Sequence, residues 1–423
     1  MADNNPLTEL GTTGLKRWGG YIGEEWLTDL RGTKGIKVYQ QMADDDPVVG
    51  AMIFAIKMLC RQVIWRVDTA GKEKPDREAA DFLTSCMDDM SAGWHDTISE
   101  ILSFLIFGWS YHEVVYKRRQ GDNRDPSKRS KYEDGKYGWR KMPIRAQSTL
   151  LEWDFDVEGG VQGMRQLPPP DYQTRYIPID RALLFRTEAT KGSPEGRSIL
   201  RNAYRPWKYK KNIEIIEGIG VERDLAGLPV AWVPPNIITG STTEEKATLS
   251  AFKSLVTNIR RDEQEGIVMP LAYDEQGNKS YDLSLLSTGG RRQFETGEII
   301  QRYNTQIAQS VLADFIMLGT QKVGSFALST SKTHIFSLAI TAFLDEVEEV
   351  FNTHAVPRLF KLNGMNLKNL PQLKHGGIED IDLVELGDFI GKLAGAGAAL
   401  FPNENLEKYL LALANLPVEG GAG

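Results

Sequence analysis

The chain has 423 residues, of which 41% are hydrophobic and 25% are charged. This composition is that of a globular protein with enough chain for two or three domains, and it excludes a wholly disordered protein. The formal net charge is −7. An acidic chain is a poor general binder of nucleic acid, because such binding depends on neutralising phosphates.

The first segments are predicted to be an arm followed by helices. Residues 1–45 hold isolated apolar side chains between glycines and charges, which is typical of an arm that becomes ordered on a partner surface. Helices are predicted from about Asp46 and over residues 76–90 and 97–107. Residues 48–67 are apolar but include three Lys or Arg residues, so we expect a buried helix there and no membrane span.

Strands are predicted next, so the first half of the chain should be α+β. Aromatic and β-branched residues favour extended chain at residues 111–116, 139–145, 150–155, 163–167 and 176–179. We expect these segments to form an antiparallel sheet with a long charged hairpin. From Lys117 to Arg145 there are eleven Lys or Arg residues against four Asp or Glu residues. This hairpin is either a nucleic-acid patch or, as we favour, a solvated hairpin balanced by acids of a neighbouring subunit.

A long amphipathic helix is predicted to begin at Ser193. Ser193-Pro194-Glu195 supplies a side-chain cap, a fixed φ and an acid at the helix start. Apolar residues then recur at three- and four-residue spacing as far as Val221. Pro206 should kink this helix or begin a second one there, and a glycine-proline joint at residues 227–229 should end it.

The second half of the chain is predicted to place a small α/β insert between long helices. Its helix at residues 242–261 begins with a Thr-Thr-Glu-Glu capping sequence, and short strands lie on either side. A second long helix is predicted over residues 291–318. The small and polar residues 319–331 are predicted to form a mobile loop. A third helix continues to about residue 355, with an apolar face made of Phe336, Ile340, Phe343, Val347 and Val350.

The sequence contains no catalytic or cofactor-binding motif. Cys60 and Cys86 lie in no CxxC or Cys/His cluster, and the five histidines are scattered, so core or solvated roles are favoured over metal ligation. The acidic triplet at residues 44–46 is expected to cap a helix. GxSxG, Walker A and strand-linked GxGxxG sequences do not occur. We therefore predict a protein that is not an enzyme and that has no cofactor or metal.

The long helices indicate self-assembly. A helix of about 28 residues is roughly 40 Å long at about 1.5 Å per residue, which exceeds the usual length in a globular domain. Packing beside identical copies in a ring would bury both sides of such helices.

Taken in order, these elements resemble a tailed-bacteriophage portal protein, most closely the Mu-like portals. The resemblance covers about residues 40–355 and rests on the order helix, α/β insert, helix, loop, helix from residue 193 onward. It also rests on four short stretches: Asp46-Pro47-Val48-Val49 opening a helix that ends in Trp65-Arg66-Val67, FGWSYHEVVY at 107–116, IPID at 177–180, and residues 196–200.

The resemblance implies an α+β, ring-forming portal fold with a defined order of parts. These parts are an N-terminal arm (1–45), the first part of the wing (46–192), a first stem helix (193–224), a small α/β clip (225–286), a second stem helix (287–318), a tunnel loop (319–331), a tunnel helix with the return to the wing (332–375), and a short helical crown and tail (376–423).

The same resemblance implies a structural role in the virion. The family forms a ring, usually of twelve copies, at one capsid vertex, and we expect assembly in the bacterial host cytoplasm with no membrane partner. The ring is a channel for packaging and ejection of double-stranded DNA and contacts the major capsid protein. The terminase large subunit docks on the clip, and head-completion or neck adaptor proteins later replace it. An acidic wall suits a channel that must let DNA pass.

Three groups of residues are the candidate sites. The tunnel loop that would face DNA contains Lys322, Gly324, Ser325, Ser329 and Ser331. The candidate docking residues of the clip are Glu244, Glu245, Arg260, Arg261, Asp274 and Glu275. The candidate subunit interface of the stem contains Tyr204, Trp207, Lys210, Lys211, Arg302 and Tyr303.

Two other hypotheses remain open at this point. A minor head-tail adaptor could use the same helices without forming a closed ring. A metal-dependent nucleic-acid enzyme would have to use the acidic triplet at residues 44–46 and the basic hairpin.

Overall fold

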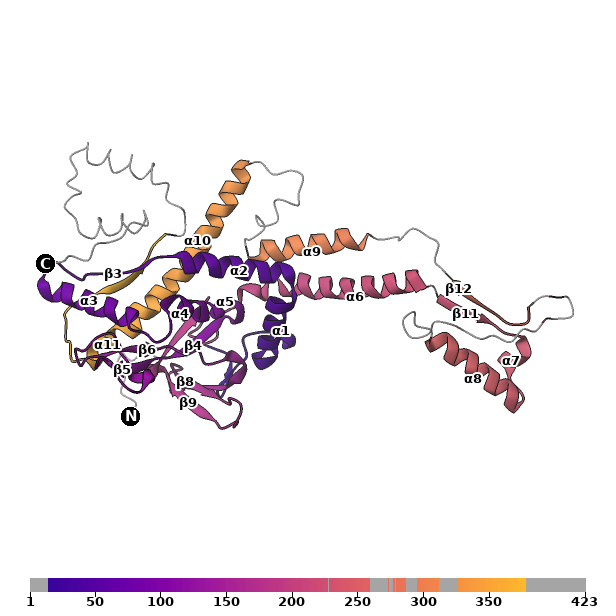
Figure 1. The fold of residues 1–423 in the computed structure, drawn as a ribbon, viewed down its shortest axis with the longest axis horizontal. Helices are drawn as coiled ribbons and strands as arrows, with labels where there is room; N and C mark the ends of the chain where they lie inside the picture. Colours follow the sequence, from indigo (N-terminus) through magenta and orange to yellow (C-terminus); the bar gives the residue numbers. More distant parts are fainter. Residues whose placement is uncertain are drawn as a thin grey trace, which may run out of the picture. The chain divides into compact units, whose positions relative to one another are not determined.

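The computed structural model describes residues 14–226, 228–258, 273, 277, 279–286, 295–311 and 326–377. The chain divides into two compact units, whose helices and larger strands are drawn in Figure 1 and labelled where there is room. Unit 1 contains the residues up to Tyr204 and those from Thr305 onward, whereas unit 2 is the continuous segment Arg205–Asn304. Both units mix helices and strands, which confirms the predicted α+β class.

Most of the helices belong to unit 1. They are α1 (Gly32–Asp45), α2 (Pro47–Gln62), α3 (Lys74–Asp88), α4 (Trp94–Ile101), α5 (Ser103–Phe107), α10 (Phe326–Val350) and α11 (Val356–Leu362). The start of α2 is the cap predicted from the acidic triplet. The Asp46 carboxylate accepts the backbone N–H groups of Val48 and Val49 at 2.9 and 3.2 Å, and Pro47 is the first helical residue.

The strands of unit 1 form several small antiparallel sheets. They pair as β1 (Arg17–Trp18) with β2 (Tyr21–Ile22), β4 (Trp109–Glu113) with β10 (Ala182–Arg186), β5 (Val115–Arg118) with β6 (Tyr137–Lys141), β3 (Trp65–Asp68) with β13 (Gln372–His375), and β7 (Leu150–Phe155) with β8 (Val161–Gln166), which also pairs with β9 (Arg175–Pro178). The sequence predicts a single sheet, and this prediction is wrong, because the strands form separate small sheets. Two strands were not predicted: β10, which pairs with β4, and β13, which pairs with β3 in a segment expected to end a helix.

Aromatic side chains fill the core beneath these sheets. The indole of Trp153 meets the rings of Trp109 and Tyr111 edge to face, with centroids 4.9 and 5.8 Å apart. The Tyr111 hydroxyl donates to the carbonyl of Ile177 at 2.9 Å, so this buried polar group is satisfied. The same cluster includes Ile36 of α1, which attaches the first helix to the sheets.

Helix α10 supplies the apolar face predicted for the third long helix. Phe336, Ile340 and Val347 are buried as expected, and Leu344 lies with them. The helix continues as a π-helical turn at Phe351–Ala355 and then as α11. The Phe351 ring packs against Trp94, Trp139 and Phe185, at centroid distances of 5.1 to 6.0 Å.

Unit 2 consists of two helices and a small α/β module between them (Figure 1). Its elements are α6 (Tyr204–Ala226) from Arg205 onward, β11 (Leu228–Trp232), α7 (Pro235–Thr239), α8 (Thr243–Asn258), β12 (Asp282–Leu286) and α9 (Thr296–Ser310) as far as Asn304. Strands β11 and β12 are antiparallel, with Leu228 opposite Leu286 and Trp232 opposite Asp282. The predicted helix of the insert is confirmed, since α8 begins directly after Thr242.

The helix predicted to begin at Ser193 begins later. The Ser193 hydroxyl donates to the carbonyl of Glu195 and accepts its N–H, which makes a local turn. Ser198 caps a short 3-10 turn at Ile199–Arg201, and α6 starts only at Tyr204. Pro206 therefore lies in the first turn of α6, where its missing N–H has no helical acceptor to lose.

Three further expectations need correction. The arm is not wholly irregular, because α1 occupies its last fourteen residues and buries Ile36, Tyr39 and Met42. The segment Trp65-Arg66-Val67 is a strand and not a helix end, because β3 pairs with β13. The loop predicted for residues 319–331 does not extend that far, because helix α10 begins at Phe326 and a helix propagates readily once begun.

Other expectations lie outside the described residues. These include the end of the helix predicted at 242–261, residues 312–318 of the second long helix, the start of the loop, and the crown from residue 378. Within the ranges that the structure describes, no helix has both the length and the apolar composition needed to cross a bilayer.

Candidate assembly and docking surfaces

Helices α6 and α9 of unit 2 run antiparallel and are joined side by side. The rings of Tyr209 and Tyr303 stack with centroids 6.3 Å apart and an angle of 19° between their planes. Farther along, the Thr296 hydroxyl donates to the Glu217 carboxylate. Because Tyr209 precedes Glu217 while Tyr303 follows Thr296, the two contacts fix the antiparallel register of the pair.

Part of α6 exposes apolar side chains. Ile215, Ile216 and Ile219 are 52%, 58% and 45% exposed, and the Tyr209 ring is 48% exposed. The sequence predicts that Ile216 and Ile219 continue the apolar stripe that begins at Ile199. In the single chain these two isoleucines are about half exposed, whereas Leu200, Tyr204 and Trp207 are buried.

The basic residues of the predicted stem interface are partly used within unit 2. Lys210 is buried, and its ammonium lies 3.8 Å from the Glu214 carboxylate one turn away. The Lys211 ammonium lies over the Trp207 ring at 5.3 Å, and the Arg302 guanidinium lies 5.2 Å from the ring centroid of Tyr303.

Tyr204, the first residue of α6, has a different role from the rest of the predicted interface. It is 7% exposed, and its hydroxyl donates to the Asp29 carboxylate at 2.8 Å. This contact lies within unit 1, to which both Tyr204 and Asp29 belong.

Of the two glutamates predicted to dock a partner, Glu245 has a structural role. Its carboxylate accepts the N–H of Thr242 at 3.0 Å and also bonds Ser241 and Asn236. The Thr242 hydroxyl accepts the N–H of Glu245 at 3.2 Å, which completes a capping box at the start of α8. The Thr242 backbone, followed by the Ser241 and Asn236 side chains, lowers the pKa of Glu245 to about 2. The neighbouring Glu244 is exposed.

The module also exposes large apolar side chains that the sequence analysis did not select. Trp232, Ile238 and Tyr273 are 60%, 63% and 58% exposed. Exposed aromatic residues are common anchors of protein interfaces. The signal available in the sequence was Trp232 at the end of a strand, where a glycine-proline joint and two further prolines restrict the chain.

Several predicted site residues cannot be placed. Arg260, Arg261, Asp274 and Glu275 of the clip and Lys322, Gly324 and Ser325 of the tunnel loop lie outside the described residues. Ser329 and Ser331 belong to helix α10 and not to a loop.

The basic hairpin is neutralised by acids of its own chain. The ammonium of Lys117 lies 3.2 Å from the Asp89 carboxylate, and both side chains are at most 5% exposed. Arg119 pairs with Asp134 at 3.1 Å, and its guanidinium lies 4.1 Å from the Tyr132 ring centroid. The expectation that a neighbouring subunit supplies the acids is therefore wrong for Lys117 and Arg119. Because both cations are paired within the chain, they are also poor candidates for binding nucleic acid.

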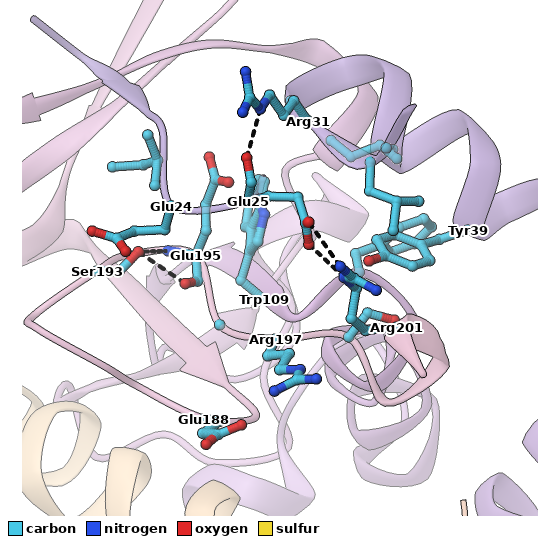
Figure 2. A pocket seen from close by; sticks show the side chains of 18 of the residues that line it. Glu24, Glu25, Arg31, Tyr39, Trp109, Glu188, Ser193, Glu195, Arg197 and Arg201 are labelled. Carbon is cyan, nitrogen blue, oxygen red and sulfur yellow. Dashed lines mark hydrogen bonds and ion pairs between the residues drawn. The ribbon is translucent and has the colours of Figure 1, made fainter. Parts of the chain in front are cut away.

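A pocket of about 360 Å³ lies between the N-terminal segment and the loop that precedes α6 (Figure 2). Figure 2 shows the Arg201 guanidinium facing the Glu25 carboxylate, which it binds through two contacts of 2.5 and 2.9 Å. Lys191 pairs with Glu24 at 2.9 Å. These pairs hold the segment around Glu24 and Glu25 against its own chain.

Glu195 is a half-buried acid of this pocket. Its carboxylate accepts the indole N–H of Trp153 at 3.0 Å. Burial raises the pKa of Glu195 above its usual value, although the Trp153 hydrogen bond acts in the opposite direction. The surrounding ion pairs make this pocket a structural joint, and no nucleophile with a neighbouring base lines it.

Within the described part of the chain, one group of side chains has the composition of a metal site. Asp345, Glu348 and His375 bring their ligand atoms within 4.8 Å of one another. His112 belongs to the core, as favoured for the histidines, because it is fully buried and burial lowers its pKa to about 4.

Comparison with known proteins finds a matching family and solved structures of similar fold. The family described as the portal protein of bacteriophage Mu matches residues 36–410. Among solved structures, a chain in the neck of an empty gene transfer agent particle, reconstructed with C6 symmetry, is similar over 93% of this chain and 95% of its own, with 14% identity and a TM-score of 0.52. A chain in the neck of a native particle, with C12 symmetry, is similar over 96% and 97%, with 12% identity and a TM-score of 0.51. A chain in the native virion gives 12% identity over 93% and 94%, with a TM-score of 0.51.

Proposed function

The chain belongs to the Mu-type family of bacteriophage portal proteins, and from this membership we propose that it assembles into a closed ring at one vertex of the capsid. The ring is the channel through which double-stranded DNA is packaged and ejected. Twelve copies are expected, a number supported by the C12 symmetry of a gene transfer agent neck that contains a chain of similar fold. Assembly takes place in the cytoplasm of the bacterial host.

The observation that carries this proposal is the half-exposed apolar strip of α6. Ile215, Ile216 and Ile219 are about half exposed in one chain, and contiguous exposed apolar side chains on one helix mark an interaction surface. In a ring, each α6–α9 pair is the stem, and the strip packs against the stem of the next copy. A ring needs such a heterologous contact, in which two different surfaces of one subunit meet.

We assign the remaining parts by the same family order. Unit 1 is the wing, and the module between α6 and α9 is the clip. Residues 319–325 remain the tunnel loop, shortened by the start of α10. Lys322 in this loop touches passing phosphates, while the acidic balance of the chain keeps DNA from being held.

The clip is the docking platform for the terminase large subunit and then for head-completion or neck proteins, and the wing contacts the major capsid protein. Trp232, Ile238 and Glu244 are the clip residues that we assign to docking, because they are exposed and Glu244, unlike Glu245, takes no part in the cap of α8. The portal itself has no catalytic role, and the packaging motor supplies the ATP chemistry.

A pair of matched substitutions tests the ring. Ile216→Asp places a charge in the strip, whereas Val157→Asp places the same charge at a 96% exposed position on the turn between β7 and β8. Native mass spectrometry and negative-stain images should show closed rings for the wild type and for Val157→Asp, and smaller species for Ile216→Asp. Compact monomers of the wild type at every concentration and salt would refute the ring.

The same measurement separates the portal from a minor head-tail adaptor, which would give open or small assemblies of the wild type. A second variant, Lys322→Glu, tests the channel. It should assemble normally and package less DNA, and particles with normal genome content would remove Lys322 from the tunnel.

A further inference from the structure

Three potential metal ligands converge from two elements of unit 1. Asp345 and Glu348 lie three residues apart on α10 and so share one face of that helix, and His375 is the last residue of β13. Their ligand atoms lie within 4.8 Å of one another. The sequence gives no sign of this group, because thirty residues separate Asp345 from His375.

The imidazole of His375 is held in one orientation. Its side chain is only 7% exposed, and the Trp65 ring meets it edge to face with centroids 5.7 Å apart. Its Nδ1 lies 2.8 Å from the carbonyl oxygen of Gly376. A carbonyl can only accept, so Nδ1 carries the hydrogen and donates it. This arrangement, in which one ring nitrogen is fixed on a carbonyl, is the usual way in which proteins orient a metal-binding histidine.

The other ring nitrogen therefore points into the acidic group. Nε2 lies 3.0 Å from Oδ1 of Asp345 and 3.9 Å from Oε2 of Glu348. A neutral imidazole would place its lone pair against two carboxylates, so either a second proton or a cation must lie between them. Glu348 is itself fixed, since its Oε1 pairs with Lys374 and its Oε2 accepts the N–H of His375 at 3.3 Å.

These distances suit a small divalent ion. Bonds of about 2.0–2.2 Å in a tetrahedral site separate neighbouring ligand atoms by roughly 3.4 Å. The two distances from Nε2 lie on either side of this value, and all the ligand atoms lie within 4.8 Å of one another, so the site would be completed by a movement of the carboxylates of exposed Asp345 and of Glu348 toward the ion. We propose that Asp345, Glu348 and His375 bind a divalent transition metal of the Zn²⁺ class, with water as the fourth ligand. Imidazole with carboxylates favours such a metal over Mg²⁺ or Ca²⁺, which prefer oxygen alone.

The metal would be a structural clamp between α10 and β13. Strand β13 is hydrogen-bonded to β3, and the metal would also join His375, the last residue of β13, to helix α10. An ion bound by the folded state alone stabilises that state, and the ligands become one cross-link across 30 residues of sequence.

Titration of the full-length, metal-free protein with ZnCl₂ tests the site. Isothermal calorimetry should give one Zn²⁺ per chain, and Co²⁺ should give visible d–d absorption typical of a low-coordinate site. Asp345→Asn, Glu348→Gln and His375→Gln should each weaken binding at least about 10-fold. His95→Gln, which removes an exposed histidine, and Glu349→Gln, which alters the next acid of α10, are matched controls and should bind as the wild type does.

Two results would overturn the proposal. Absence of stoichiometric Zn²⁺ binding to the wild type would make the group an imidazolium ion pair only. Equal binding by the wild type and Asp345→Asn would place any bound ion elsewhere. The Asp345 variant keeps the test decisive if the buried His375 variant fails to fold, because the Asp345 side chain is 65% exposed.

Discussion

The side-chain amide of Asn352 and the backbone of Leu373 exchange two hydrogen bonds of 2.8 Å, one in each direction. Asn363, eleven residues farther along, does the same with the backbone of Tyr137, at 2.7 and 2.9 Å. Each asparagine amide thus makes the two hydrogen bonds that the backbone of a neighbouring strand would make. The turn after α10 and the end of α11 are fastened in this way to β13 and β6.

Replacing these two asparagines by alanine should have unequal effects. Asn352→Ala leaves the buried backbone of Leu373 without partners, which costs about 2–4 kcal/mol of unfolding free energy. Asn363→Ala should cost about 1 kcal/mol, because Tyr137 is 41% exposed and water can replace the amide. Urea denaturation measures both values, and hydrogen exchange at Leu373 should accelerate only in the first variant. Equal losses would show that burial does not set the cost.

The neighbouring acids Asp88 and Asp89 should also differ. Asp89→Ala leaves the buried Lys117 ammonium without its carboxylate, so we expect a loss of about 3–5 kcal/mol. Asp88 pairs with Lys131 at an exposed site, and Asp88→Ala should cost less than about 1 kcal/mol. Chemical denaturation of the two variants measures the difference. A mild effect of Asp89→Ala would mean that Lys117 reaches water when its partner is removed.

A threonine-to-alanine substitution should have opposite effects on the stability of α8 at two positions, because Thr242 belongs to the capping box and Thr248 does not. Thr242→Ala removes the cap hydroxyl and should destabilise the helix by about 1 kcal/mol. Thr248→Ala, inside the same helix, should be neutral or slightly stabilising, since alanine is the better helix former. Hydrogen exchange of the first turn of α8 reports on both. Faster exchange in Thr248→Ala than in Thr242→Ala would contradict the assignment of the cap.

The half-buried acid Glu195 should make stability depend on pH. Its pKa is raised in the folded protein, so the folded state takes up the proton first and stability falls as pH rises through the raised value. Glu195→Gln keeps an acceptor for Trp153 and removes the charge. The variant should melt higher than the wild type at neutral pH, and the difference should shrink as the pH is lowered to 4.5, the unshifted value.

Thermal melts across this range, with Glu244→Gln as an exposed control, measure the effect. A lower melting temperature of Glu195→Gln at neutral pH would show that the ionised carboxylate is stabilised by the pocket.

Local sequence rules predicted the elements that depend on neighbouring residues. The cap at Asp46, the capping box before α8 and the apolar face of α10 are all confirmed, because each is determined within a few residues. The family resemblance is confirmed by the match over residues 36–410.

Features that depend on distant partners could not be predicted. Strand β13 is formed by pairing with β3, about 300 residues earlier, and the four residues of β13 contain no pattern that predicts a strand. Ser193 and Glu195 have the residue types of a helix start, but they form a local turn, and Ser198 caps the first helical turn instead. The ligands of the group at His375 come together only in the folded chain.

Unit 2 is one uninterrupted segment whose two ends are joined by the stack of Tyr209 on Tyr303. A segment that leaves and returns at one place can change length or sequence without altering the path of the chain on either side. The segment Arg205–Asn304 is therefore a unit that can be exchanged whole, with cuts between Tyr204 and Tyr209 and between Tyr303 and Thr305. Such an exchange would replace every exposed side chain of the α/β module while the sequence of unit 1 stays the same.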